Sequence, residues 1–111
     1  MRNSYNQFDT FKRNNILVDI LFSAKGKANA VSSYEIAEMV ESKGYKTKQK
    51  SVSVMVRNVM YDRKLPICHH NSKGYYWASN KADIEECVAE MESRIEAMQK
   101  HIEHLKAFLI E

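Results

Sequence analysis

The sequence contains no uninterrupted apolar run approaching the roughly 20 residues that a membrane-spanning helix needs. Its N-terminal stretch is polar and lacks the apolar core of a secretory signal, so we expect a cytoplasmic protein. Only two cysteines occur, Cys68 and Cys87, and they form no spacing motif. We therefore expect both to be reduced and partly buried thiols rather than a structural disulfide.

Motifs for catalysis and for metal binding are also missing. There is no glycine-rich phosphate loop, and no serine or cysteine has an identifiable base partner. The cysteines and histidines lack zinc-finger spacing, and the adjacent residues 68–70 of a predicted strand point to opposite faces. His101 and His104 share one helical face but are interpreted as solvated polar residues. We expect no enzymatic activity, no cofactor and no metal site.

Charge is distributed unevenly along the chain. Residues 1–80 carry 13 Lys or Arg against 6 Asp or Glu, whereas residues 81–111 carry 4 against 8. Positive charge concentrates further between residues 43 and 64, where Asp62 is the single acid. A basic front half favours a polyanionic partner, and the acidic tail indicates a separate role.

The three glycines end predicted helices or lie in a predicted turn, and the single proline, Pro66, stands where a helix has ended and a strand begins. Apolar residues at helical spacing predict a first helix over residues 9–24, which Gly26 ends, and a one-bridge strand at residues 30–31. The sequence Ser32-Ser33-Tyr34-Glu35 predicts a capping box that starts a second, short helix, which Gly44 ends. A short turn then separates this helix from the next one.

A third helix is predicted from Thr47, as the cap, to about Arg63. Val52, Met55, Val56, Val59 and Met60 form one apolar stripe along it, so the opposite face is left to polar residues. Residues 65–70 and 75–78 are rich in strand formers and flank a polar turn containing Gly74, which predicts a β-hairpin. Tyr75, Tyr76 and Trp77 either pin this hairpin to the helices or stack on bases, as aromatics do in single-strand binders.

Helix, short strand, helix, turn, helix and hairpin form the element order of a winged helix-turn-helix domain. In that fold the third helix enters the DNA major groove and the hairpin, or wing, reaches the neighbouring backbone. The alternative for Lys48, Lys50 and Arg57 is that their side chains are merely solvated and bind no partner. The residues that we expect to contact DNA are Thr47, Lys48, Gln49, Lys50, Ser51, Ser53, Val54, Arg57 and Asn58 in the third helix, and Asn71, Ser72 and Lys73 at the wing tip.

The stretch from SSYEIAEMVESKGYKTKQKSVSVMV to LPICHHNSKGYYWA resembles winged helix-turn-helix proteins of bacterial phages and mobile elements. Its ending, followed by an acidic heptad helix, is similar to small phage proteins of Gram-positive hosts. The resemblance covers roughly residues 10–110. It implies DNA binding by the third helix and the wing, but it identifies neither an operator nor a pathway.

The last part of the chain predicts a long helix that Ser79 or Asn80 caps. An unbroken heptad seam runs along it, with spacings alternating between four and three residues, which predicts a coiled-coil homodimer. β-Branched residues at the a positions favour two parallel strands, whereas the flanking pairs leave the orientation open. The alternative is that this helix folds back on the first helix of its own chain. The seam residues at the a positions are Val88, Ile95, Ile102 and Leu109, and those at the d positions are Ile84, Met91, Met98 and Leu105.

Together these patterns predict a mainly α protein with a small β-hairpin: a winged helix-turn-helix domain over residues 1–79 and a dimerisation helix over residues 80–111. We expect a dimeric, sequence-specific binder of double-stranded DNA, acting as a transcriptional regulator or as a phage or plasmid replication or partition factor. The alternative function is a protein-interaction module, such as a phage inhibitor of a host complex, because the winged-helix fold alone does not settle function.

Overall fold

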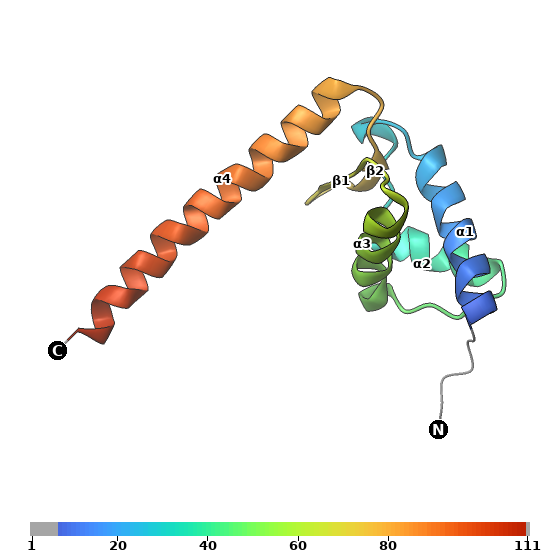
Figure 1. The fold of residues 1–111 in the computed structure, drawn as a ribbon, viewed down its shortest axis with the longest axis horizontal. Coiled ribbons are helices and arrows are strands. Elements are labelled where there is room, and N and C mark those ends of the chain that lie inside the picture. The colour runs from blue at the N-terminus through green and yellow to red at the C-terminus, as the bar shows by residue number, and fades with distance from the viewer. Residues whose placement is uncertain (1–6, 111) are drawn as a thin grey trace.

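The computed structural model describes residues 7–110; residues 1–6, part of the polar N-terminal stretch, and residue 111 lie outside the described range. The chain is mainly helical, with one antiparallel hairpin and a long C-terminal helix, as the sequence predicts. The helices are α1 (Gln7–Ser23), α2 (Ser33–Ser42), α3 (Val52–Arg63) and α4 (Lys81–Lys106), and the strands are β1 (Ile67–His70) and β2 (Gly74–Trp77). Residues 7–80, called the head below, are compact, whereas α4 projects away from them (Figure 1).

The core of the head is formed by the apolar stripes of α1, α2 and α3. Leu17 and Leu21 of α1 are fully buried, as are Ile36 and Val40 of α2 and Val52 of α3. Phe8 and Phe11, which the periodicity assigns to the same stripe of α1, instead remain 63% and 57% exposed. They lie before the part of α1 that meets the core, and their rings face the cations of Lys12 and Arg63.

Helix α2 begins where the sequence predicts. The Ser32 hydroxyl accepts a hydrogen bond from the Glu35 backbone N–H, and the Glu35 carboxylate accepts one from the Ser32 N–H. This capping box satisfies two of the donors that every helix leaves open at its start. At the other end Gly44 adopts a positive φ of 103°, which favours glycine over other residues.

The hairpin is tied to the helices along the outer edge of β2. Val31 and Tyr75 exchange two backbone hydrogen bonds of 2.7 and 2.8 Å, forming the one-bridge strand that the sequence predicts. Near the other end of β2, the Trp77 N–H donates to the carbonyl of Ala24. These bonds cover an edge that would otherwise expose unpaired backbone groups.

Helix α4 is attached through a small second cluster. Cys68, Tyr76 and Cys87 are buried together, and an ion pair of 2.8 Å joins Lys27 to Glu86. Both cysteines are free thiols, and burial raises the pKa of Cys68 to about 12. The Cys68 thiol therefore stays protonated and packs as a small apolar group.

Helix α4 starts where the sequence predicts but ends earlier than the predicted seam. Helix α4 begins after Asn80, whose side chain accepts a hydrogen bond from the Asp83 N–H, as expected for a cap. It ends at Lys106, so Leu109, predicted as part of the helical seam, lies in a following 3₁₀ turn, Ala107–Leu109. That turn is wound more tightly than an α-helix.

Candidate nucleic-acid interface

The segment before α3 differs from the predicted helix. Thr47 does not cap α3, because its hydroxyl donates to the carbonyl of Tyr45 at 2.7 Å. Lys48 has an extended backbone, and Gln49–Ser51 form a 3₁₀ turn before α3 begins at Val52. The predicted helix start at Thr47 is therefore wrong, and residues 47–51 form a loop that leads into α3.

This loop lines a polar groove of about 500 Å³ at the start of α3. The side chain of Gln49 donates a hydrogen bond of 3.3 Å to the Ser33 hydroxyl, which joins the loop to the first turn of α2. Four of the predicted DNA-contacting residues thus come together. The residues lining this polar groove are Ser33, Lys48, Gln49, Lys50, Ser53 and Tyr75.

The charge on this surface is not neutralised within the head. Among residues 7–110, none of Lys48, Lys50 and Arg57 forms an ion pair with an acid. All three side chains are exposed. Arg57 lies close enough to Tyr75 to oppose the effect of burial, which raises the pKa of that phenol. The cations are therefore available to an anionic ligand from outside.

Helix α3 divides into a buried and an exposed face, as the spacing of its apolar residues predicts. Ser53, Val54, Arg57 and Asn58 are all exposed, although Asn58 lines a separate depression shared with α1 residues such as Arg13. Asn58 therefore lies at the edge of this face that is farthest from the polar groove. Ser51, the residue just before α3, is also exposed and makes no side-chain cap.

The hairpin turn places Asn71, Ser72 and Lys73 at an exposed tip. The Ser72 backbone N–H donates to Nδ1 of His70 at 3.2 Å, which shapes the turn. On the adjoining strands, the rings of His69 and Tyr75 lie with their centroids 4.5 Å apart and their planes tilted by 45°. Burial, together with the nearby charges of Arg94 and His70, lowers the pKa of His69. The tip itself therefore carries one permanent cation, Lys73.

Two groove residues were not among the predicted contacts. Ser33 follows the capping residue Ser32, so the sequence marks it only as the first residue of α2 and not as part of a binding surface. Tyr75 was assigned to the hairpin aromatics, whereas in the structure Tyr76 is buried and Tyr75 faces the groove. Strand alternation separates these two neighbours onto opposite faces, but the sequence does not say which face meets the core.

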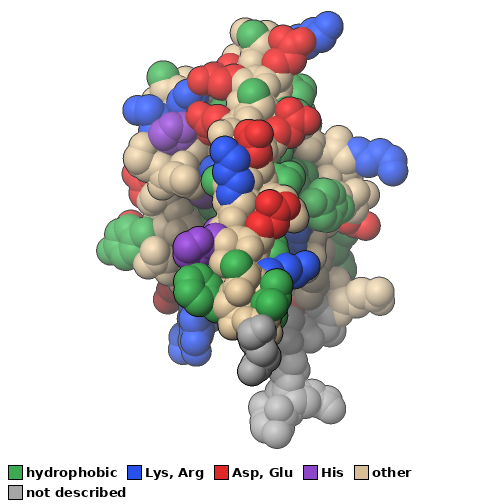
Figure 2. Space-filling model, turned by 90° about the vertical axis from the view of Figure 1, so that its left-hand side faces the viewer, with side chains coloured by type: hydrophobic (Ala, Val, Ile, Leu, Met, Phe, Trp, Pro, Cys, Tyr) green, Lys and Arg blue, Asp and Glu red, His purple; other side chains and the backbone are tan. Residues whose placement is uncertain are grey.

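The predicted seam of α4 is exposed along its whole length. The eight seam side chains range from 41% exposed at Val88 and Ile102 to 78% at Leu109. Phe108 and Ile110, which flank Leu109, are 75% and 79% exposed. Viewed from the α4 side, acidic side chains lie along this helix with hydrophobic side chains between them (Figure 2). The structure thus shows an apolar helix face that the head does not cover, rather than a helix folded back on α1.

No known protein family, curated protein or solved structure matches this chain. Among the described helices, none is both long enough and apolar enough to cross a membrane. The features that bear on function are therefore the two surfaces just described, the polar groove with α3 and the exposed seam of α4.

Proposed function

We propose that this chain binds double-stranded DNA as a winged helix-turn-helix protein, with α3 in the major groove and the β1–β2 hairpin as the wing. The observation that carries the proposal is the polar groove at the start of α3, where Lys48 and Lys50 have no acidic partner among residues 7–110. Phosphate oxygens are the anions that such lysines and a helix start bind most readily.

The residue types on this surface fit duplex DNA in particular. Arginine and lysine read guanine in the major groove, and glutamine reads adenine, so Arg57, Lys50 and Gln49 supply the side chains that direct readout uses. Ser53 and Ser33 add hydroxyl donors for the backbone. The exposed face of α3 is flanked by this groove, which places phosphate and base contacts side by side.

The hairpin tip fits the role of a wing. Asn71, Ser72 and Lys73 are exposed polar residues on a turn whose base is fixed to Val31 by two backbone hydrogen bonds. A rigid base and a cationic tip suit contact with a phosphate backbone beside the major groove. Lys73 is the side chain expected to make that contact.

The exposed seam of α4 supports a homodimer, because an apolar face of this length is an aggregation hazard without a partner. Two heads in a symmetric dimer would bind the two halves of a pseudo-palindromic site, and their modest affinities would combine. Such a dimer would serve as a transcriptional regulator or as a phage or plasmid replication or partition factor, in keeping with the resemblance described above.

The DNA-binding half of the proposal is tested by fluorescence anisotropy of a labelled random duplex over a salt series. The wild-type chain should lose affinity steeply with salt as counterions are released. The double variant Lys50→Ala/Arg57→Ala should bind at least about tenfold more weakly, with a salt slope reduced by about two. The matched control is Lys81→Ala/Lys100→Ala, which removes the same charge from α4 and should bind like the wild type.

Sequence specificity is tested by selecting bound fragments from a random duplex library. Enrichment of a two-fold symmetric motif is expected, and Gln49→Ala should relax the preference at one position of each half-site. If the wild-type chain fails to bind DNA at low salt, the proposal is wrong. The exposed α4 seam would then favour the protein-interaction module.

A further inference from the structure

We propose that a second copy of this chain packs antiparallel along α4 and inserts its Phe108 into a groove between α3 and α4. The inference deepens the dimer half of the proposed function and rests on it. It concerns the orientation of the two α4 helices and the contact at their ends, which the heptad pattern leaves open.

The groove lies beside the start of α4 and has a volume of about 500 Å³. Its walls come from α3, from β1 and β2, and from α4, and they are mainly apolar. Met91 belongs both to this groove and to the exposed seam, so the two apolar surfaces are continuous. The residues that line this α3–α4 groove include Met60, Tyr61, Ile67, Cys87, Met91 and Arg94.

An antiparallel pairing matches all eight seam positions in register. In such coiled coils each a position faces a d position of the other helix, and the seam is long enough for this to hold at every layer. The registered pairs are Ile84 with Leu109, Val88 with Leu105, Met91 with Ile102, and Ile95 with Met98. In this register every layer pairs one β-branched residue with one leucine or methionine. Each layer therefore has the same mixed composition, and no layer places two β-branched residues together.

The side chains flanking the seam favour the same orientation. In the antiparallel register the e position of Glu85 faces Lys106 of the second copy, and symmetry forms this attractive pair twice. Both side chains are exposed, and Glu85 has only a weak 4.0 Å contact with Lys81 in its own helix. In a parallel register Lys106 would instead face His101, and no acid–base pair would form along the seam.

The g positions connect the seam to the α3–α4 groove. Cys87 and Arg94 both occupy g positions and both line the groove, so this flank of α4 faces the head. In the antiparallel register Phe108 of the second copy lies opposite Cys87, next to Met91. Phe108 is 75% exposed in the single chain, and its ring packs edge-on against that of His104 near the end of α4. The groove therefore offers this aromatic side chain the cover that its own chain does not.

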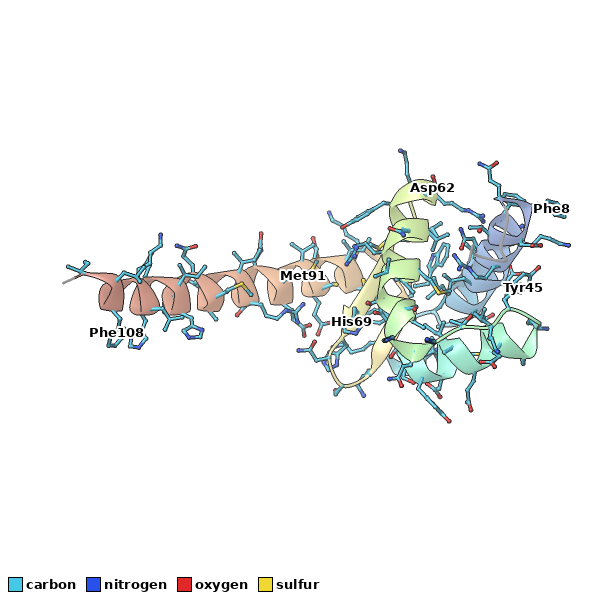
Figure 3. The ribbon with its side chains drawn as sticks, turned by 90° about the horizontal axis from the view of Figure 1, so that it is seen from below. Phe8, Tyr45, Asp62, His69, Met91 and Phe108 are labelled. Atoms are coloured by element: carbon cyan, nitrogen blue, oxygen red, sulfur yellow. The ribbon has the colours of Figure 1, made fainter. Side chains whose placement is uncertain are left out.

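The shape of the molecule leaves room at the α3–α4 groove for the C-terminal end of a second copy's α4, but less room for a second head. The head and α4 meet at an angle, with Met91 close to the head and Phe108 just beyond the far end of α4 (Figure 3). A parallel partner would bring its own head to this junction, whereas an antiparallel partner brings residues 96–109, which are the end of α4 and the 3₁₀ turn that follows it. The 26 residues of α4 span about 39 Å, so the two heads would lie at opposite ends, separated by roughly one turn of DNA.

Zero-length carbodiimide cross-linking of the wild-type protein, followed by peptide mass spectrometry, tests the orientation. A Glu85–Lys106 cross-link is expected. Within one chain these residues lie about 32 Å apart along the helix, so such a link can form only between antiparallel copies. The Ile95→Asp variant, which should sediment as a monomer, should lose it. A wild-type dimer that lacks this cross-link would overturn the antiparallel arrangement, whereas a wild-type monomer would overturn the dimer half of the proposed function.

The contact at the groove is tested by two substitutions at neighbouring, equally exposed residues. Phe108→Ala should weaken dimerisation at least about tenfold by sedimentation equilibrium, because a buried aromatic anchor is lost twice per dimer. Ile110→Ala removes a comparable side chain from outside the seam and should leave the dimer affinity unchanged. Circular dichroism controls for folding of both variants. Equal affinities of the two variants would overturn the placement of Phe108.

A charge exchange provides a second measurement of the register. Glu85→Lys should weaken the dimer, and the double variant Glu85→Lys/Lys106→Glu should restore it. The matched control pairs Lys106→Glu with Glu92→Lys, because Glu92 faces the neutral Gln99 in the proposed register. Rescue by the first pair alone supports the antiparallel register, and the absence of rescue contradicts it.

Discussion

The head and α4 use apolar side chains in opposite ways. In the head, the largest aliphatic residues of three helices are fully buried against one another. In α4, side chains of the same kind remain 41–78% exposed along the seam, and Cys87 is the only described residue of that helix that is buried. The free energy of burial is thus gained within one chain in the head, whereas in α4 it is available only to a partner.

Truncating one aliphatic side chain in each region should produce the largest difference in the free energy of unfolding. Leu21→Ala in the head is expected to lower the free energy of unfolding by about 2–5 kcal/mol, because Leu21 is fully buried and the substitution leaves a cavity. Ile95→Ala in α4, 65% exposed, should change that free energy little when the chain is dilute and monomeric. Urea unfolding followed by Trp77 fluorescence measures both.

The same pair becomes more informative when protein concentration is varied. The effect of Leu21→Ala should persist at every concentration, whereas the effect of Ile95→Ala should grow as dimers form. A large, concentration-independent loss of stability in the Ile95→Ala variant would mean that α4 packs on its own head, and the contrast between the regions would fail.

A smaller effect is expected at the junction of the hairpin with the helices. Gly74 has a φ of 109°, and a Cβ atom at this position would collide with the carbonyl oxygen of Val31. Gly74→Ala should therefore cost about 1–3 kcal/mol or more, since the backbone must shift as well as bear the strain. Gly44 has a similar φ of 103° but open space around it, so Gly44→Ala isolates the cost of backbone strain alone. If Gly74→Ala and Gly44→Ala lowered stability equally in thermal unfolding, the backbone near Val31 would have moved away from the added methyl group without further cost.

The order of elements was predictable because local signals and burial agree in the head. The capping box at Ser32, the stop at Gly44 and the stripe of α3 each depend on neighbours within four residues of the chain. The start of α3 was predicted too early, since Thr47 is a good cap by type but its hydroxyl is used by the Tyr45 carbonyl. That choice depends on loop geometry, which spacing does not reveal.

The candidate site was predictable only in part, for a similar reason. Lys48, Gln49 and Lys50 stand out as polar residues before an amphipathic helix. Their arrangement around Ser33 and Tyr75 depends on how α2 and β2 pack against the loop, and these segments lie far apart in the sequence. The groove beside α4 was not predictable at all, because four separate elements form its walls.

The smallest effect is expected where the two regions join, at Asp83 in the first turn of α4. Its carboxylate accepts hydrogen bonds from the Ser79 hydroxyl and N–H, at 2.7 and 2.8 Å. These bonds, together with the Lys27 charge, lower the pKa of Asp83 below its ordinary value of 3.8. A carboxyl whose pKa is lowered in the folded state stabilises that state above the unfolded pKa. The contribution is lost as the pH falls through the folded value.

Asp83→Asn should therefore lower the melting temperature slightly at neutral pH, and the difference from wild type should vanish as the pH falls below 3.8. The control is Asp19→Asn, which removes an exposed carboxylate from α1, away from the junction. A difference between Asp83→Asn and wild type that does not depend on pH would mean that charge contributes nothing to this attachment. The buried cluster of Cys68, Tyr76 and Cys87, together with the Lys27–Glu86 pair, would then be what holds α4 to the head.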